Sequence, residues 1–143
     1  MKFTILLSPD DIRQGVAFSS KKRLFESIAA FVVEKLQCEN GEQACFECLF
    51  EREKLGNSGL GNGVAMPKAK LPATVSDKIL TVFMQLETPV EYDAADNKPV
   101  DIVFAVLVPE NHCQEYIPVL AELNEKLTDK NLIKQLRSAQ SAD

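Results

Sequence analysis

Apolar residues recur at helical spacing near the start of the chain. Between positions 19 and 36 every fourth residue is apolar, namely Leu24, Ile28, Val32 and Leu36. This period places them on one face of a helix. Ser19 or Ser20 can cap that helix before Lys21. Its first turn, Lys21 to Arg23, is cationic, which indicates either a solvated face or a docking surface for an acidic partner or a phosphate.

A second helix is predicted from Gly41 to Leu55, with Arg52 in its last turn and Gly56 as a left-handed C-terminal cap. The segment after it holds four glycines in eight residues: Gly56-Asn57-Ser58-Gly59-Leu60-Gly61-Asn62-Gly63. Glycine is favoured where the backbone needs a positive φ or approaches another group closely. We therefore expect this glycine loop to be a place where something binds.

Three apolar stretches are typical of strands. Val64–Met66 is a short strand stopped by Pro67. Lys78–Leu86 is a longer one that we expect to end at positions 87–89, Glu-Thr-Pro. Val100–Val108 is almost wholly apolar, which is typical of a central strand buried on both faces.

The last third of the chain is predicted to be helical. Pro109 opens a helix that carries Ile117, Leu120, Leu123 and Leu127 on one face. Pro118 fits only in a first turn, so this helix is expected to start near Glu115. Thr128 and Asp129 can cap a final short helix that runs through Leu132, Ile133 and Leu136.

Length and composition favour one domain spanning residues 1–143. The chain is 45% hydrophobic, enough for a single well-buried core. The net charge of -5 disfavours nucleic acid and anionic membranes as partners. No apolar run approaches the roughly 20 residues of a membrane-spanning helix, and the N-terminus lacks a signal-peptide core, so we expect a cytoplasmic protein without membrane insertion.

The cysteines and the single histidine suggest no metal or cofactor site. Cys38, Cys45, Cys48 and Cys113 are too few for a disulfide framework and are expected to be free thiols. The Cys45-x-x-Cys48 pair lies inside a predicted helix, where core thiols are a better interpretation than a redox pair. His112 is alone, which excludes a two-histidine metal or relay site, and the spacing does not indicate zinc.

The glycine loop matches neither the Walker nor the Rossmann fingerprint, because it follows a helix and is not closed by Gly-Lys-Ser/Thr. A glycine-rich loop beside Arg52 and ahead of a strand still suggests an anion or phosphoryl site formed by backbone N–H groups. The alternative is an ordinary tight connection.

The run from Arg52 to Pro67, Arg-Glu-Lys-Leu-Gly-Asn-Ser-Gly-Leu-Gly-Asn-Gly-Val-Ala-Met-Pro, resembles the signature of the bacterial phosphotransferase system enzyme IIA domains of the fructose, mannitol and nitrogen class. The nitrogen branch is the most similar. The resemblance also includes Ser20-Lys21-Lys22-Arg23, Phe83-x-x-Leu86-Glu87-Thr88-Pro89-Val90, Asp96-x-x-Pro99-Val100-Asp101 and Leu107-Val108-Pro109-Glu110. It implies a single α/β domain with a mixed sheet of about five strands flanked by helices, here without the family's final helix.

The resemblance also implies a chemistry. In the family, the residue after the motif proline is a histidine that takes a phosphoryl group from an HPr-like phosphocarrier, cradled by the arginine and the glycine loop. That position is Lys68 here, and the family's second histidine aligns with Tyr116. The loop also carries Asn57 and Ser58 where Ser-Thr is usual. An unperturbed lysine must lose a proton before it can act as a nucleophile, at a cost of about 4.6 kcal/mol at pH 7.

Three hypotheses follow. The first is a non-phosphorylatable module that regulates partners, by resemblance a potassium-transport component or a sensor kinase. The second is a working phosphocarrier, either because His112 is used instead or because Lys68 is an introduced substitution. The third is a thiol or metal protein that shares only the fold.

Overall fold

The sheet and its helices are seen in a computed structural model, which describes residues 12–36, 41–71, 79–92, 96 and 98–138. The strands are β1 (Ile12–Val16), β2 (Gly59–Gly61), β3 (Val64–Ala65), β4 (Lys68–Leu71), β5 (Leu80–Val90) and β6 (Val100–Pro109). The helices are α1 (Lys21–Leu36), α2 (Gly41–Leu55), the 3₁₀ helix η3 (Glu110–Tyr116), α3 (Ile117–Leu127) and α4 (Lys130–Ser138). They form the single α/β domain that the sequence predicts.

Strand β6 is the centre of a mixed sheet. The six described strands, against about five predicted, run in the order β1-β5-β6-β3-β2, and β4 also pairs with β6. Strand β6 is antiparallel to β5 and parallel to both β3 and β4. Nine of its ten residues are buried, which confirms the prediction of a central strand covered on both faces.

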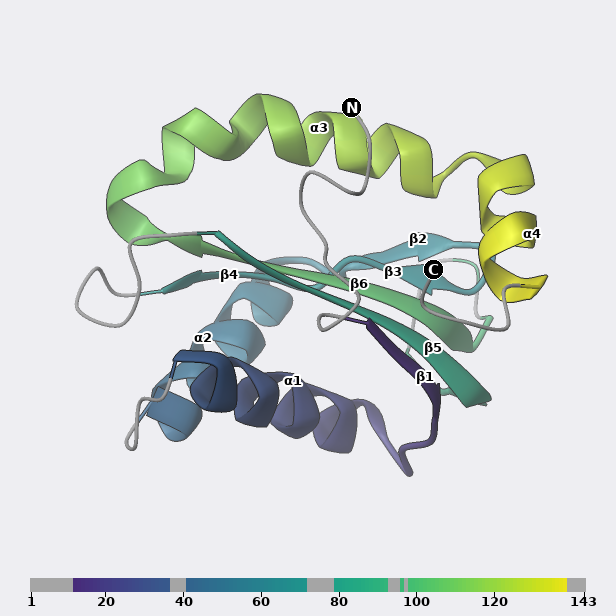
Figure 1. Ribbon diagram of the computed structural model, residues 1–143, viewed down its shortest axis with the longest axis horizontal. Helices are drawn as coiled ribbons and strands as arrows, with labels where there is room; N and C mark the ends of the chain where they lie inside the picture. Colours follow the sequence, from purple (N-terminus) through teal and green to yellow (C-terminus); the bar gives the residue numbers. More distant parts are fainter. Residues whose placement is uncertain (1–11, 37–40, 72–78, 93–95, 97, 139–143) are drawn as a thin grey trace.

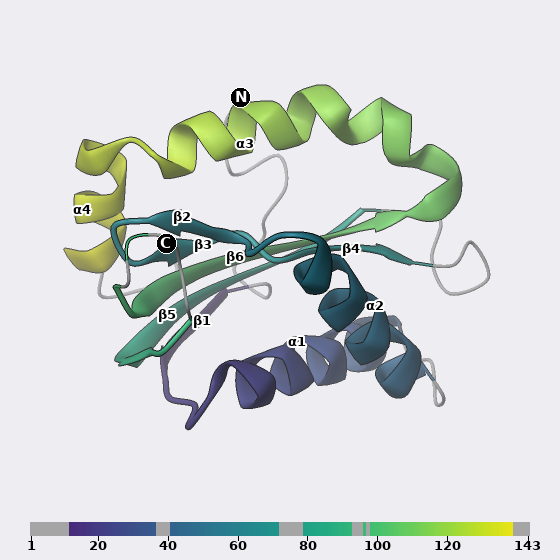
Figure 2. The same ribbon diagram turned by 180° about the vertical axis from the view of Figure 1, so that it is seen from behind.

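Alternate residues of β6 supply two apolar cores on opposite faces of the sheet. Val103, Ala105 and Leu107 join the core beneath α1 and α2. Phe104 and Val106 join the core beneath α3 and α4. Figures 1 and 2 show α1 and α2 on one side of the sheet and α3 on the other, with α4 beside one end of the sheet. Burial of each large apolar side chain contributes about 1.5–3 kcal/mol to stability. Because β6 carries such side chains on both faces, both faces must be covered by helices.

Two predicted helix caps are present. The Arg23 N–H donates to Ser20 Oγ at 3.2 Å, so Ser20 rather than Ser19 caps α1. The Asn131 N–H donates to Asp129 Oδ1 at 2.9 Å at the start of α4. Each bond satisfies an N–H group that has no partner within its own helix.

Several boundaries differ from the prediction. Gly56 ends α2 without a left-handed conformation, so its predicted role as a left-handed cap was wrong. Strand β5 continues through positions 87–89 because buried Val90 resumes pairing with Val100. Helix α3 begins at Ile117, and the preceding residues Glu110–Tyr116 form the 3₁₀ turn η3.

The described cysteines lie in α2. Cys45 is buried and Cys48 is partly buried, and neither forms a disulfide bond, as predicted. Burial, followed by the carboxylates of Glu51 and Glu47, raises the pKa of the Cys48 thiol. A raised pKa disfavours the thiolate that redox and metal chemistry need. Cys38 and the side chain of Cys113 lie outside the described residues.

The described helices are also too short or too polar to cross a bilayer.

The tip of the β2–β3 hairpin is a tightly braced turn. Gly61, Asn62 and Gly63 have φ values of 89°, 56° and 82°, so the second half of the glycine loop does require the left-handed region. Arg137 of α4 donates to the Asn62 carbonyl and pairs with Asp101 at 2.9 Å. The turn therefore connects α4 to the start of β6.

Replacing Gly63 with alanine should destabilise the fold by about 2–4 kcal/mol. The added Cβ would lie 2.9 Å from Asp101 Oδ1 and closer still to Arg137 Nη2, at a φ of +82°. Urea unfolding measures the loss. Gly56→Ala is the matched control, since nothing lies within 4 Å of its Cβ position. That variant should keep its stability or gain up to about 1 kcal/mol, and equal losses in both variants would contradict this account.

Candidate functional site

Lys68 begins strand β4, immediately after Pro67. The Val106 N–H of β6 donates to the Pro67 carbonyl at 2.9 Å, and Lys68 then pairs with Val106 in the parallel ladder. Paired residues of neighbouring strands project to the same face of a sheet. The partly buried Lys68 side chain therefore lies on the face where Val106 joins the α3-side core.

The end of α2 brings Arg52 and Glu53 close to Lys68. Helix α2 packs against β4, and Figure 2 shows its end meeting the sheet there. The Met66 N–H, two residues before Lys68, donates to the Ser58 carbonyl at 3.0 Å, which holds the start of the glycine loop beside this point. Arg52 Nη1 donates a long hydrogen bond of 3.4 Å to the Gly56 carbonyl, which uses one of its five N–H groups.

This environment changes the acidity of Lys68. Burial is the largest cause and lowers the pKa of its ammonium group below 10.5, and the positive charge of Arg52 lowers it further. The carboxylate of Glu53 opposes both effects. Both shifts depend on tertiary packing, so the sequence alone showed neither.

Glu53 is the centre of a hydrogen-bonded cluster next to Lys68. Its side chain is only 8% exposed. Ser58 donates to it twice, from Oγ to Oε2 at 2.8 Å and from the backbone N–H to Oε1. Lys21 Nζ lies 3.5 Å from Oε1. A nearly buried carboxylate is stable only when it is paired and hydrogen-bonded in this way, which also explains a cation in the first turn of α1.

Tyr92 also belongs to this hydrogen-bonded cluster. Its side chain is fully buried, its hydroxyl lies 2.5 Å from Ser58 Oγ, and Lys21 Nζ sits 4.2 Å from its ring centroid. Burial, followed by the charge of Glu53, raises the pKa of Tyr92 well above its ordinary value, while the hydrogen bond to Ser58 opposes them. The phenol therefore stays protonated and can donate to Ser58. No sequence signal marked Tyr92, because its partners are distant along the chain.

The structure divides the glycine loop into two parts. Positions 56–58 lie beside Lys68, whereas Asn62 and Gly63 form the hairpin tip, up to roughly 16 Å away along the extended chain. Several loop N–H groups already have acceptors. The N–H groups of Gly59 and Asn62 donate to Asn57 Oδ1 at 2.7 Å and Asp96 Oδ2 at 2.9 Å. An anion beside Lys68 would therefore meet side-chain donors, above all Arg52.

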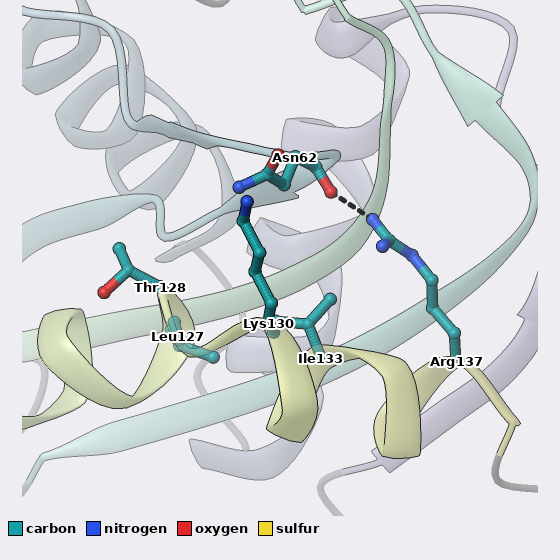
Figure 3. A pocket seen from close by; sticks show the side chains of 6 residues that line it. All are labelled: Asn62, Leu127, Thr128, Lys130, Ile133 and Arg137. Atoms are coloured by element: carbon teal, nitrogen blue, oxygen red, sulfur yellow. Dashed lines mark hydrogen bonds between the residues drawn. The ribbon is translucent and has the colours of Figure 1, made fainter.

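A separate pocket of about 250 Å³ lies between the hairpin tip and α4. In Figure 3, Lys130 points toward Asn62, and Arg137 reaches the carbonyl of Asn62 from the far end of the helix. The charge of Arg137 is matched by Asp101, and backbone N–H groups of Asn62 and Lys98 lower the pKa of Asp96 nearby. The contacts of Arg137 beside this pocket hold α4 against the hairpin tip and the start of β6.

The two other candidate residues lie in η3. Tyr116 ends η3 and is partly buried against the α3-side core, on the same face of the sheet as Lys68. The backbone of His112 lies within η3, but its side chain is outside the described part of the structure.

Comparison with known proteins gives consistent relatives. Residues 5–143 match the family described as phosphoenolpyruvate-dependent sugar phosphotransferase system, EIIA 2. A nitrogen regulatory protein homolog from Haemophilus influenzae is 75% identical over 143 residues, all of this chain and 87% of that protein. The crystal structure of nitrogen regulatory protein IIA-Ntr from Neisseria meningitidis is 38% identical with a TM-score of 0.87, covering 96% of this chain and 92% of that one.

A more distant structure shares the fold. It is the mannitol enzyme IIA of Escherichia coli in complex with phosphorylated enzyme IIB, at 22% identity and a TM-score of 0.71. The match covers 94% of this chain and 90% of that one.

The amine of Lys68 should titrate with a midpoint below 10.5, and Arg52→Gln should raise that midpoint by removing a nearby positive charge. The unfolded chain binds this proton more tightly than the fold does. The free energy of unfolding therefore gains a contribution as pH rises from the folded pKa to 10.5, and Lys68→Met should abolish it.

NMR titration of the Lys68 side chain and urea unfolding across that pH window make the two measurements. A midpoint that does not respond to Arg52→Gln would contradict the proximity of the two cations.

Proposed function

Since the chain belongs to the EIIA 2 family of the phosphoenolpyruvate-dependent sugar phosphotransferase system, we propose that it works as a nitrogen-regulatory EIIA protein whose Lys68 makes it a binding module that carries no phosphoryl group. The observation that supports this most directly is the place of Lys68. It follows the motif proline at the start of β4, beside Arg52, where the family's phospho-accepting histidine is expected.

The chemistry of the two side chains explains why the exchange changes function. A neutral imidazole offers a lone pair near pH 7, because its unperturbed pKa is about 6.5. An amine with an unperturbed pKa near 10.4 is almost wholly protonated at that pH. Burial and Arg52 lower the pKa of Lys68, but Glu53 holds a carboxylate close by and favours the charged form. The resting state of Lys68 is an ammonium ion.

The charge at this site fixes the signalling state in the proposal. A phosphoryl group would add about -1.5 to -2 charges there. Lys68 instead adds a positive charge next to Arg52, so the site corresponds to the unphosphorylated protein. Partners that recognise the unphosphorylated state through an acidic surface would bind at all times.

The surroundings of Lys68 are suited to a protein partner. Leu55, at the end of α2, is 84% exposed, and Ile117, directly after Tyr116, is 59% exposed. Leu55 ends α2, which packs against β4, and Ile117 follows η3, which contacts β4 from the other side of the sheet. The partners in this proposal are an HPr-like phosphocarrier and regulatory targets of the potassium-transport or sensor-kinase type. Of the other candidate residues, Gly56, Asn57, Ser58 and Tyr116 lie at the edge of the proposed contact surface.

Incubation with enzyme I, the HPr-like phosphocarrier and phosphoenolpyruvate should leave the intact mass of the protein unchanged, because Lys68 is protonated. Lys68→His should gain a phosphoryl group, since Arg52 and its loop are in place to stabilise it. A stoichiometric acid-labile gain in the unaltered protein would overturn the proposal, and its loss in His112→Ala would identify His112 as the acceptor.

Binding of a regulatory target should follow the charge at position 68. The unaltered protein and unphosphorylated Lys68→His should both bind, whereas Lys68→Glu should bind about tenfold or more weakly to an acidic surface. The difference should shrink with added salt, since the Debye length is about 8 Å at physiological ionic strength. Calorimetry with each candidate target at two salt concentrations measures this. Equal binding by Lys68→Glu would place Lys68 outside the interface.

A further inference from the structure

We propose that Lys68 is an acylation site for small acyl phosphates, with Arg52 binding the phosphate while the Lys68 amine attacks the acyl carbon. The reaction concerns the same site as the proposed function, and only its effect on partner binding rests on that function. It would give the domain a switch that needs no histidine.

The packing of α2 on β4 brings the Arg52 guanidinium near the Lys68 amine. Lys68 is partly buried at the first position of β4, and Arg52 is partly exposed in the last turn of α2, which packs on β4. Arg52 makes its long hydrogen bond to the Gly56 carbonyl. Arg52 is partly exposed, so a small anion can approach it from solvent.

The cluster next to these residues is hydrogen-bonded and contains an ion pair. Glu53 is held by Ser58 and Lys21, and Ser58 is held in turn by buried Tyr92. Lys21, Arg52 and Lys68 carry three positive charges around the single carboxylate of Glu53. The site therefore has a local excess of positive charge. A guanidinium binds phosphate oxygens with a planar pair of N–H groups, which gives geometric selectivity as well as attraction.

The chemistry of Lys68 and Arg52 together defines the class of ligand. A lysine that is partly desolvated and lies next to another cation has more neutral amine, the form that attacks carbon. A ligand for both residues must combine a phosphate with an electrophilic carbon. An acyl phosphate, the mixed anhydride of a carboxylic acid and phosphoric acid, has both within a few bonds.

The step is balanced without any further reagent. The lone pair of neutral Lys68 Nζ forms a bond to the carbonyl carbon, and the bond from that carbon to the bridging phosphate oxygen breaks. The electron pair leaves with inorganic phosphate, and the extra proton on nitrogen passes to water. The product is an amide that no longer carries the positive charge of Lys68.

This reactivity is compatible with the absence of phosphoryl relay in the proposed function. A phosphocarrier must load and unload quickly, so a mostly protonated amine is unsuited to it. An amide accumulates once formed, so a small neutral fraction is enough. The acyl group also removes the charge that the proposed partners would recognise.

Acetyl phosphate is the probe, and Lys70 is the internal control, because it lies in the same strand and is exposed. After incubation at fixed pH, peptide mass spectrometry should find Lys68 acetylated about tenfold faster than Lys70. Inorganic phosphate should compete at Lys68 only. Arg52→Gln should remove most of the preference for Lys68 while Lys70 is unaffected, with folding checked by circular dichroism.

Acetic anhydride, which lacks a phosphate, separates recognition from intrinsic reactivity. The proposal expects a smaller preference for Lys68 with this reagent than with acetyl phosphate. It is overturned if Lys68 reacts no faster than Lys70 with acetyl phosphate, or if the preference survives both Arg52→Gln and excess phosphate. Loss of target binding after acetylation would be tested separately, so failure of the proposed function would leave the acetylation result interpretable.

Discussion

Strand β6 must be covered on both faces, and the rest of the structure follows from that requirement. Its alternate residues supply both apolar cores, so α1 and α2 are held on one side and α3 and α4 on the other. Its backbone pairs with β3, β4 and β5. The bond from the Val106 N–H to the Pro67 carbonyl fixes where β3 gives way to β4, and so fixes the position of Lys68. The position of Lys68 thus depends on a strand in which nine of ten residues are buried.

The second organising element is electrostatic. Glu53 is almost buried, yet its carboxylate is satisfied by Ser58 and Lys21, and it lies close enough to Lys68 to favour the charged amine. This cluster joins the first turn of α1, the last turn of α2 and the start of the glycine loop. A family signature that appears continuous along the sequence is therefore held together by Tyr92, which lies outside it.

Periodicity predicted the elements that bury a regular apolar pattern. Helix α1 and strand β6 were identified because their apolar patterns are long and unambiguous. Strands β1, β2 and β4 were missed. Their ranges, Ile12–Val16, Gly59–Gly61 and Lys68–Leu71, contain polar residues or glycine and gain their structure from pairing with neighbours. The resemblance marked Arg52 and Lys68 as a site. It did not reveal that the glycine loop divides, because the braces on its tip, Arg137 and Asp96, are distant in sequence.

Strand β4 has a further consequence for behaviour at high concentration. Among the described strands it pairs with β6 alone, so its other side is an edge with backbone groups able to pair with another chain. Natural sheets discourage such edge-to-edge association by placing lysine on their edges. Strand β4 reads Lys-Ala-Lys-Leu, with Lys68 and Lys70 alternating with buried Ala69 and Leu71. These two lysines place positive charge on the edge, which disfavours pairing with a second chain.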